Sequence, residues 1–177
     1  LIDPICVQGT IDAERLVGIG APVEQVHVMG TVKFDVAERN PVGEEAAVEI
    51  MRRIGVPSDA VILLGGSTWP GEEDILCGIY KRLRSGYPNL FLVLVPRHVE
   101  RAGEVVQCLE AHGLSYLRRS RIDGSGLQRP DVLFIDTTGE LRNFYATADI
   151  IFVGKSLCEH GGQNPIEPAM CGKAVVV

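Results

Sequence analysis

Short apolar runs alternate with helical patterns from residue 60 to the end of the chain, and this alternation constrains the fold most. The runs carry few polar residues, which is typical of strands buried on both faces of a parallel sheet. The rhythm predicts an α/β domain, a doubly wound parallel sheet with helices on both faces. We expect strands at 60–64, 90–95, 132–135, 150–153 and 174–177, and helices at 72–84, 100–112, 140–148 and 165–171.

The first part of the chain has a weaker pattern. Apolar runs at 5–7 and 26–29 flank a helical pattern at 12–19, which predicts a short strand, helix and strand. Residues 30–43 have little periodicity and contain glycine and proline, so we expect a linker there. An amphipathic helix is expected at 44–53, because its apolar residues recur at spacings of three and four.

Composition excludes several classes of protein. The 177 residues include 17 Lys and Arg against 23 Asp and Glu, a net charge of −6 at pH 7. Without a block of basic residues, a nucleic-acid partner is not expected. The longest apolar run, 90–96, is far shorter than the roughly 20 residues that a membrane span needs, so we expect no span.

The cysteines show no metal or disulfide spacing. They are odd in number and form no CxxC pair, so we expect reduced thiols of a cytosolic setting and no zinc site. Cys158 and His160 are interpreted as ordinary loop residues. The chain starts without Met and ends inside an apolar run, so we expect a fragment of a longer protein. The cysteines are Cys6, Cys77, Cys108, Cys158 and Cys171.

The segments after the first two strands of the predicted sheet favour an anionic ligand. Such sheets bind ligands outside the carboxyl ends of their strands. Residues 65–68 combine two glycines with Ser67 and Thr68 before a helix, which suits close approach of a phosphate; alternatively, a hydroxyl merely caps the helix. Arg97 follows Pro96 after the next strand and suits a phosphate or carboxylate; alternatively, it pairs with a nearby glutamate on the surface.

Two later segments extend this pattern. Residues 136–142 bring Gly139 to a helix start, where Glu140 is also explained by the helix dipole. Residues 161–169 contain two glycines, a polar pair and Glu167, whose carboxylate suits the two hydroxyls of a ribose; alternatively, it only complements the dipole. The chain has no Walker A loop, GxGxxG fingerprint or G-x-S-x-G motif, so the predicted crevice is interpreted as a nucleotide holder.

These segments, in this order, resemble the Kdo transferases, bacterial enzymes that move 3-deoxy-D-manno-octulosonic acid from its CMP-activated form to the lipid A precursor of lipopolysaccharide. The resemblance covers almost the whole chain. It rests on Ile11–Leu16, Val26–Asp35, Gly66–Thr68, Val95–His98, Asp136–Leu141 and Gly161–Ala169.

The resemblance implies a GT-B glycosyltransferase built from two Rossmann-like halves. Residues 1–35 would be the end of the acceptor-side half and the interdomain link, and 36–177 the CMP-Kdo binding domain, truncated at its carboxyl end. The first set of residues below would bind the donor nucleotide, and the second set would contact the donor phosphate or sugar. The sets are Pro96, Arg97, Thr138, Gly139, Glu140, Asn164, Pro165, Ile166 and Glu167; and Ser67, Thr68, Gly162 and Gln163.

The resemblance also implies a reaction for the intact protein. A glutamate base in the absent acceptor-side half would deprotonate an acceptor hydroxyl, which displaces CMP with inversion. This scheme needs no metal and no cofactor, and this chain alone should be inactive. The lipid A precursor and the membrane contact, at the cytoplasmic face of the inner membrane, belong to the absent half, while the fragment itself is expected to be soluble.

The chain departs from the family pattern at Trp69, Thr138, Lys155 and Gln163, where the family often has His, Met, Gly and His. Backbone contacts would survive the change at Thr138, whereas the changes at Trp69, Lys155 and Gln163 leave the donor-sugar preference open. Two other interpretations also stay open: another GT-B UDP-sugar transferase or epimerase, and a non-catalytic nucleotide-binding module.

Overall fold

The computed structural model describes residues 4–31, 40–122, 128–159 and 161–177, and the chain divides into two compact units, Leu1–Glu38 and Arg39–Val177. In the first unit, β1 (Ile5–Val7) and β2 (Val26–Val28) pair in parallel, with Ile5 opposite Val26. Helix α1 (Thr10–Gly18) and the 3₁₀ turn η1 (Val23–Gln25) connect them. The expected strand, helix and strand are confirmed. The expected boundary at 35/36 lies outside the described residues.

The second unit is built on a six-stranded parallel sheet with the strand order β5-β6-β4-β3-β7-β8. Strands β4, β5 and β6 lie on one side of β3, and β7 and β8 lie on the other. The direction in which the chain adds strands to the sheet therefore reverses between β3 and β7. This arrangement confirms the predicted doubly wound α/β fold. The strands are β3 (Val61–Thr68), β4 (Leu90–Pro96), β5 (Tyr116–Arg118), β6 (Val132–Phe134), β7 (Ile150–Val153) and β8 (Ala174–Val176).

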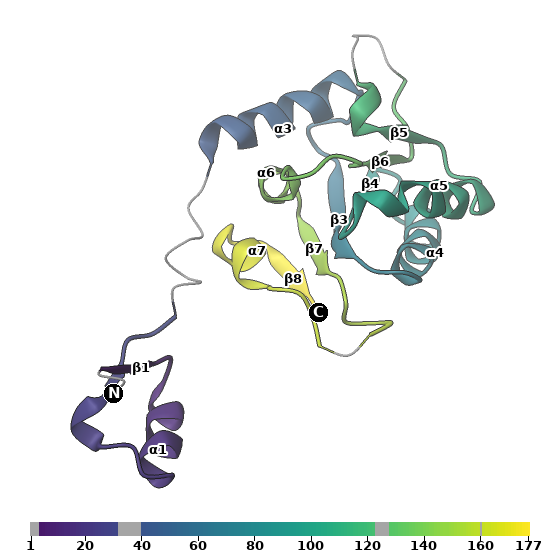
Figure 1. The fold of residues 1–177 in the computed structure, drawn as a ribbon. Coiled ribbons are helices and arrows are strands. Elements are labelled where there is room, and N and C mark those ends of the chain that lie inside the picture. The colour runs from purple at the N-terminus through teal and green to yellow at the C-terminus, as the bar shows by residue number, and fades with distance from the viewer. Residues whose placement is uncertain (1–3, 32–39, 123–127, 160) are drawn as a thin grey trace. The chain divides into compact units, whose positions relative to one another are not determined.

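Helices cover both faces of this sheet (Figure 1). One apolar cluster joins the sheet to α3 and α6, and a second joins it to α4 and α5. Successive strand residues alternate between the two clusters, as Leu63 and Leu64 do, because side chains of a strand point to opposite faces. The helices are α3 (Pro41–Arg53), α4 (Glu72–Arg84), α5 (Ala102–Ala111), α6 (Leu141–Tyr145) and α7 (Ile166–Met170), with 3₁₀ turns η2 (Val99–Arg101) and η3 (Arg119–Arg121).

The expected linker at 30–43 is partly wrong. Helix α3 begins at Pro41, and the side chain of Asn40 caps it by accepting a hydrogen bond from Gly43 N at 3.2 Å. Proline suits the first helical position, because the amide that it lacks has no partner there. Residues 32–39 of the expected linker lie outside the described residues.

Other boundaries differ from the predicted ones. Strand β3 continues to Thr68, where a loop was expected, and the short strand β5 was not expected at all. The predicted helix at 140–148 covers only Leu141–Tyr145. Within the described ranges, no helix has the length and apolar character that crossing a membrane requires.

Candidate functional site: a pocket at the strand ends

A pocket of about 220 Å³ lies at the carboxyl ends of β3, β4 and β6. It lies outside the carboxyl ends of the strands, the edge at which sheets of this kind bind ligands. The structure therefore brings together several predicted site residues that are far apart in the sequence. The lining residues are Ser67, Val95, Pro96, Arg97, His98, Val99, Glu100, Thr137, Thr138, Gly139 and Leu141.

The end of β3 supplies only one of its two hydroxyls to the pocket. The pairing of β3 with β4 shifts register between Gly66 and Thr68, and Ser67 adopts a φ of 53°, which places it in the left-handed region. Ser67 lines the pocket, whereas Thr68 is fully buried and donates its hydroxyl to Glu73 Oε1 at 2.7 Å. The structure thus places the Thr68 hydroxyl on a protein carboxylate, away from the pocket.

Arg97 presents an exposed guanidinium at the end of β4. Its backbone N–H donates to Thr68 O at 3.0 Å, which fastens the start of this loop to β3. Glu104, one of the glutamates near Arg97 in the sequence, instead accepts a hydrogen bond from Arg101 Nε at 2.9 Å. Among the described residues, Arg97 forms no side-chain ion pair. Its charge is therefore available to an anion in the pocket.

The loop between β6 and α6 forms the opposite wall. Thr138 and Gly139 are exposed, and Gly139 has a φ of +84°, which favours glycine. Glu140 does not line the pocket, since its carboxylate binds Arg119 Nη2 at 2.9 Å and accepts the hydroxyl of Thr137. Its role in the structure is to hold this loop against the 3₁₀ turn η3.

Asp136, at the start of the same loop, also holds it in place. Its carboxylate binds Arg118 Nε at 2.7 Å and accepts the backbone N–H and the hydroxyl of Ser120 at 2.8 and 2.6 Å. Burial alone would raise the pKa of Asp136, but the hydrogen bonds from Ser120 and Arg118 together lower it. Asp136 is therefore a charged structural group.

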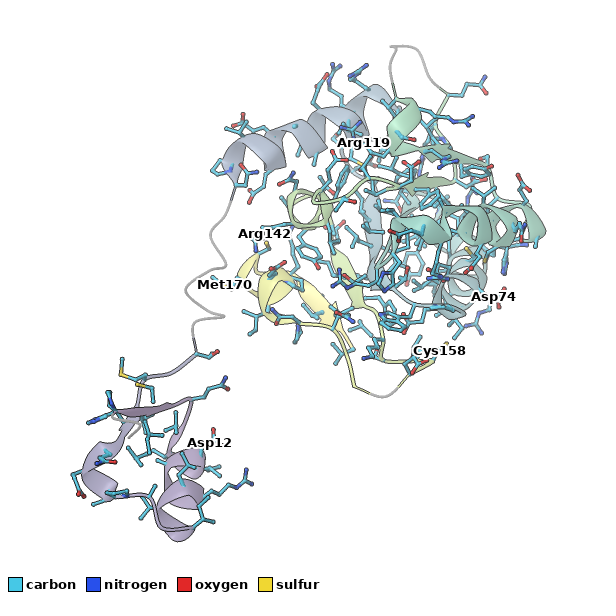
Figure 2. The ribbon with its side chains drawn as sticks, in the orientation of Figure 1. Asp12, Asp74, Arg119, Arg142, Cys158 and Met170 are labelled. Atoms are coloured by element: carbon cyan, nitrogen blue, oxygen red, sulfur yellow. The ribbon has the colours of Figure 1, made fainter. Side chains whose placement is uncertain are left out.

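The glycine-rich segment lies apart from the pocket lining. Asn164 Oδ1 accepts from Ile166 N at 3.0 Å, and Gln163 N donates to Gly154 O at 3.0 Å. Glu167, on the first turn of α7, binds Arg142 Nη2 at 2.7 Å. Arg142, which lies on α6, is labelled in Figure 2. Gly162 and residues 163–167 are therefore not among the residues that line this pocket, and His160 lies outside the described residues.

Sequence reasoning missed Glu72, which joins the end of β3 to the loop after β7. Glu72 is fully buried, and its carboxylate accepts the backbone N–H of Trp69 at 2.8 Å. It also accepts the N–H groups of Lys155, Ser156 and Leu157 at 3.0, 3.0 and 3.2 Å. In the sequence, an acidic residue at a helix start indicates only a favourable interaction with the helix dipole. Nothing local in the sequence indicates that Glu72 also binds the backbone of residues 155–157.

The same junction requires a glycine. A Cβ at Gly154 would lie 2.2 Å from Ser67 O, a backbone atom that cannot move aside cheaply. The next residue, Lys155, has a φ of 70°. The ends of β3 and β7 therefore approach each other as closely as their backbones allow.

Two departures from the family pattern contact each other beside the pocket. Lys155 Nζ lies 5.1 Å from the centroid of the Trp69 ring, and His98 meets that ring edge-on at 5.7 Å. Trp69 Nε1 is buried and has no hydrogen-bond partner among the described residues. These three side chains form a rim next to the pocket, which His98 also lines.

Comparisons with known proteins support one family. No family model matches the chain. It is 34% identical over 172 residues to the 3-deoxy-D-manno-octulosonic acid transferase of Haemophilus influenzae, covering 94% of this chain and 38% of the relative. It is 34% identical over 179 residues to the enzyme of that name from Bordetella pertussis, covering 99% and 40%. The chain thus spans about two fifths of the length of these curated relatives.

A solved structure agrees with the sequence comparison. The C-terminal CMP-Kdo binding domain of WaaA from Acinetobacter baumannii matches with a TM-score of 0.69 at 28% identity, covering 78% of this chain and 71% of that one. The parallel sheet, its two helical layers and the pocket at the strand ends match the carboxyl-terminal half of a GT-B fold. Within that class the chain is similar to the Kdo transferases, and the resemblance stated from the sequence is confirmed.

Proposed function

We propose that this chain is the donor-binding part of a Kdo transferase and that it binds CMP-Kdo in the pocket at the strand ends. The observation that carries the proposal is Arg97, whose exposed guanidinium lines that pocket without a protein carboxylate on it among the described residues. CMP links its nucleoside to the sugar through one phosphate, and a guanidinium suits phosphate geometry. The names of the similar proteins supply the identity of the donor.

The other residues are assigned by their position. Ser67 and the backbone of Thr138 and Gly139 lie close enough to line the space around a phosphate bound by Arg97. Pro96 forms the buried end of β4 beneath it. Asn164, Pro165, Ile166 and Glu167 are assigned to the nucleoside, with Glu167 at the ribose and Arg142 fixing its orientation. Glu140 is assigned to loop support in addition to its predicted nucleotide contact.

The reaction of the whole protein follows from the same assignment. Residues 1–35 are assigned to the acceptor-side half and link, and 36–177 to the donor domain. The catalytic base and the lipid A precursor site belong to the acceptor-side half, as does contact with the inner membrane. Arg97 would stabilise the phosphate of CMP as it leaves, an effect that raises the rate because charge develops there in the transition state. The chain alone would bind donor but transfer nothing.

Calorimetric titration of the chain with CMP, UMP and CDP tests this proposal. We expect saturable binding that prefers CMP and is weakened at least about tenfold by Arg97→Ala and by Glu167→Gln, each variant losing a charge-assisted hydrogen bond. Arg82→Ala and Glu45→Gln are matched controls, because both residues are exposed and neither lines the pocket. Preference for UMP would favour a UDP-sugar enzyme, and binding that is unchanged by Arg97→Ala would overturn the site.

A transfer assay tests the wider assignment. The protein that includes the acceptor-side half should transfer the sugar from CMP-Kdo to a lipid A precursor, and Arg97→Ala should lower its kcat. The 177-residue chain should show no transfer. Transfer by this chain alone would contradict the division of labour between the two halves, and nucleotide binding without transfer by the longer protein would favour a non-catalytic module.

A further inference from the structure

Three side chains of metal-ligand type meet where helix α4 packs against α5 and the residue that ends it. The ligand atoms of Asp74, Cys108 and His112 all lie within 4.8 Å of one another. The buried thiol of Cys77 interacts electrostatically with that of Cys108 and lies beside this group. Figure 2 labels Asp74, the member of this group that lies in the first turn of α4.

The spacing of these residues directs them toward each other. Asp74 and Cys77 are three residues apart on α4, and Cys108 and His112 are four apart at the end of α5. Residues at these spacings share one face of a helix. Both helices are fixed to the same face of the sheet by Leu76, Val105 and Leu109, so the two pairs are held on rigid elements.

Existing contacts already orient the imidazole. His112 Nε2 lies 2.8 Å from Asp74 Oδ1, and Lys81 Nζ donates to His112 O at 2.7 Å, which fixes the end of α5. The Asp74 side chain is 73% exposed and that of His112 is 20% exposed. An ion can therefore enter from solvent on the carboxylate side and meet the sulfur ligands on the inner side.

We propose that Asp74, Cys108 and His112, with Cys77 beside them, bind a zinc ion that fastens α4 to α5. Thiolate, imidazole and carboxylate are the ligand types that Zn²⁺ takes in proteins, and a sulfur-containing set disfavours Mg²⁺ and Ca²⁺. The site is separate from the pocket of the proposed function, whose lining includes none of these residues. It was not expected from the sequence because its pairs come from different helices, with Asp74 and His112 separated by 38 positions.

Titration of the reduced, metal-free chain with Zn²⁺, and separately with Mg²⁺, tests the site. We expect one zinc ion per chain, no comparable binding of magnesium, and a higher midpoint of thermal unfolding with zinc, since a ligand of the native state stabilises it. Cys108→Ala and His112→Gln should each weaken zinc binding by at least about tenfold, the loss that even an outer partner of a metal ligand causes. Asp74→Asn, a change at an exposed position, should weaken it without harm to the fold.

Matched controls separate a built site from adventitious binding. Cys6→Ala and His27→Gln remove an exposed thiol and an exposed imidazole from the first unit and should leave zinc binding unchanged. Circular dichroism checks that each variant is folded, and Co²⁺ should give a thiolate charge-transfer band that Cys108→Ala weakens. Failure of the reduced chain to take up stoichiometric zinc would overturn the proposal, as would equal losses in the cluster and control variants. Nucleotide binding should be the same in all of them, so this result is independent of the donor proposal.

Discussion

The guanidinium of Arg101 donates two parallel hydrogen bonds to the carboxylate of Glu73, from Nη1 to Oε1 at 3.0 Å and from Nη2 to Oε2 at 3.1 Å. The Glu73 side chain is only 3% exposed and that of Arg101 is 15% exposed. The pair joins the first turn of α4 to the turn that precedes α5. Because Glu73 also accepts the Thr68 hydroxyl, it connects both helices to the end of β3.

Removal of this guanidinium should destabilise the fold strongly. Arg101→Ala leaves the Glu73 charge buried without its partner, and we expect a loss of about 3 kcal/mol in the free energy of unfolding measured with urea. The control is Arg52→Ala, which breaks the solvent-exposed pair of Arg52 with Glu49 and should have a much smaller effect. Equal losses in the two variants would contradict a structural role for the buried pair.

The buried carboxylate of Glu72 should be needed for the shape of the crevice. Glu72→Gln replaces one acceptor oxygen by an N–H₂ group that faces backbone N–H donors, so we expect a loss of roughly 2–3 kcal/mol. Hydrogen exchange should show faster exchange of the Lys155, Ser156 and Leu157 amides in the variant. Glu45→Gln, at an exposed position of α3, is the control. Unchanged exchange at these amides would be evidence that the Glu72 carboxylate does not hold the loop after β7.

Stability should depend on pH through Asp136. The pKa of Asp136 is lowered in the folded chain. Its contribution to stability is therefore fully present above the pKa of an unfolded aspartate, about 3.9, and is lost as the pH falls through the folded value. We expect Asp136→Asn to be less stable than wild type at pH 7. Measured by urea unfolding from pH 6 downward, its free energy of unfolding should therefore fall less with decreasing pH than that of wild type. Asp59→Asn, at an exposed residue, should keep the wild-type slope.

Two glycine substitutions should have opposite signs. Gly154→Ala places a methyl group against Ser67 O and should destabilise the fold and weaken nucleotide binding. Gly78→Ala lies inside α4, where a Cβ meets nothing within 4 Å, and should stabilise by about 0.5–1 kcal/mol through helix propensity. Thermal unfolding of the two variants checks both signs, and destabilisation by Gly78→Ala would contradict the open space at that position.

The apolar runs predicted the sheet well because burial on both faces leaves a strong pattern in the sequence. Strand β7 (Ile150–Val153) and helix α4 (Glu72–Arg84) have the predicted bounds. Strand β5 was missed, since it is a partly buried edge strand of Tyr116, Leu117 and Arg118 with no apolar run. Gly65 and Gly66 suggested a loop, yet the sheet carries β3 through them because neighbouring strands pair on both sides.

The candidate site was predictable only where the strand ends define it. Pro96, Arg97 and Gly139 meet in the pocket because parallel strands deliver their following loops to one edge of the sheet. The partners of Glu140 and Glu167 were not predictable, because Arg119 and Arg142 approach them only through tertiary packing. Their predicted roles at the nucleotide stay predictions.

The hydrogen bonds between Glu72 and the loop after β7 also bear on the order in which the chain folds. Its hydrogen bonds to the β7 loop join groups 83 to 85 positions apart, so they form only after β3 and β7 have both taken their places in the sheet. Contacts of such long range close large loops and therefore come late. On a ribosome, the loop after β7 would stay unshaped until β7 and the residues that follow it had emerged, so this part of the crevice would form later than the pairing of β3 with β4.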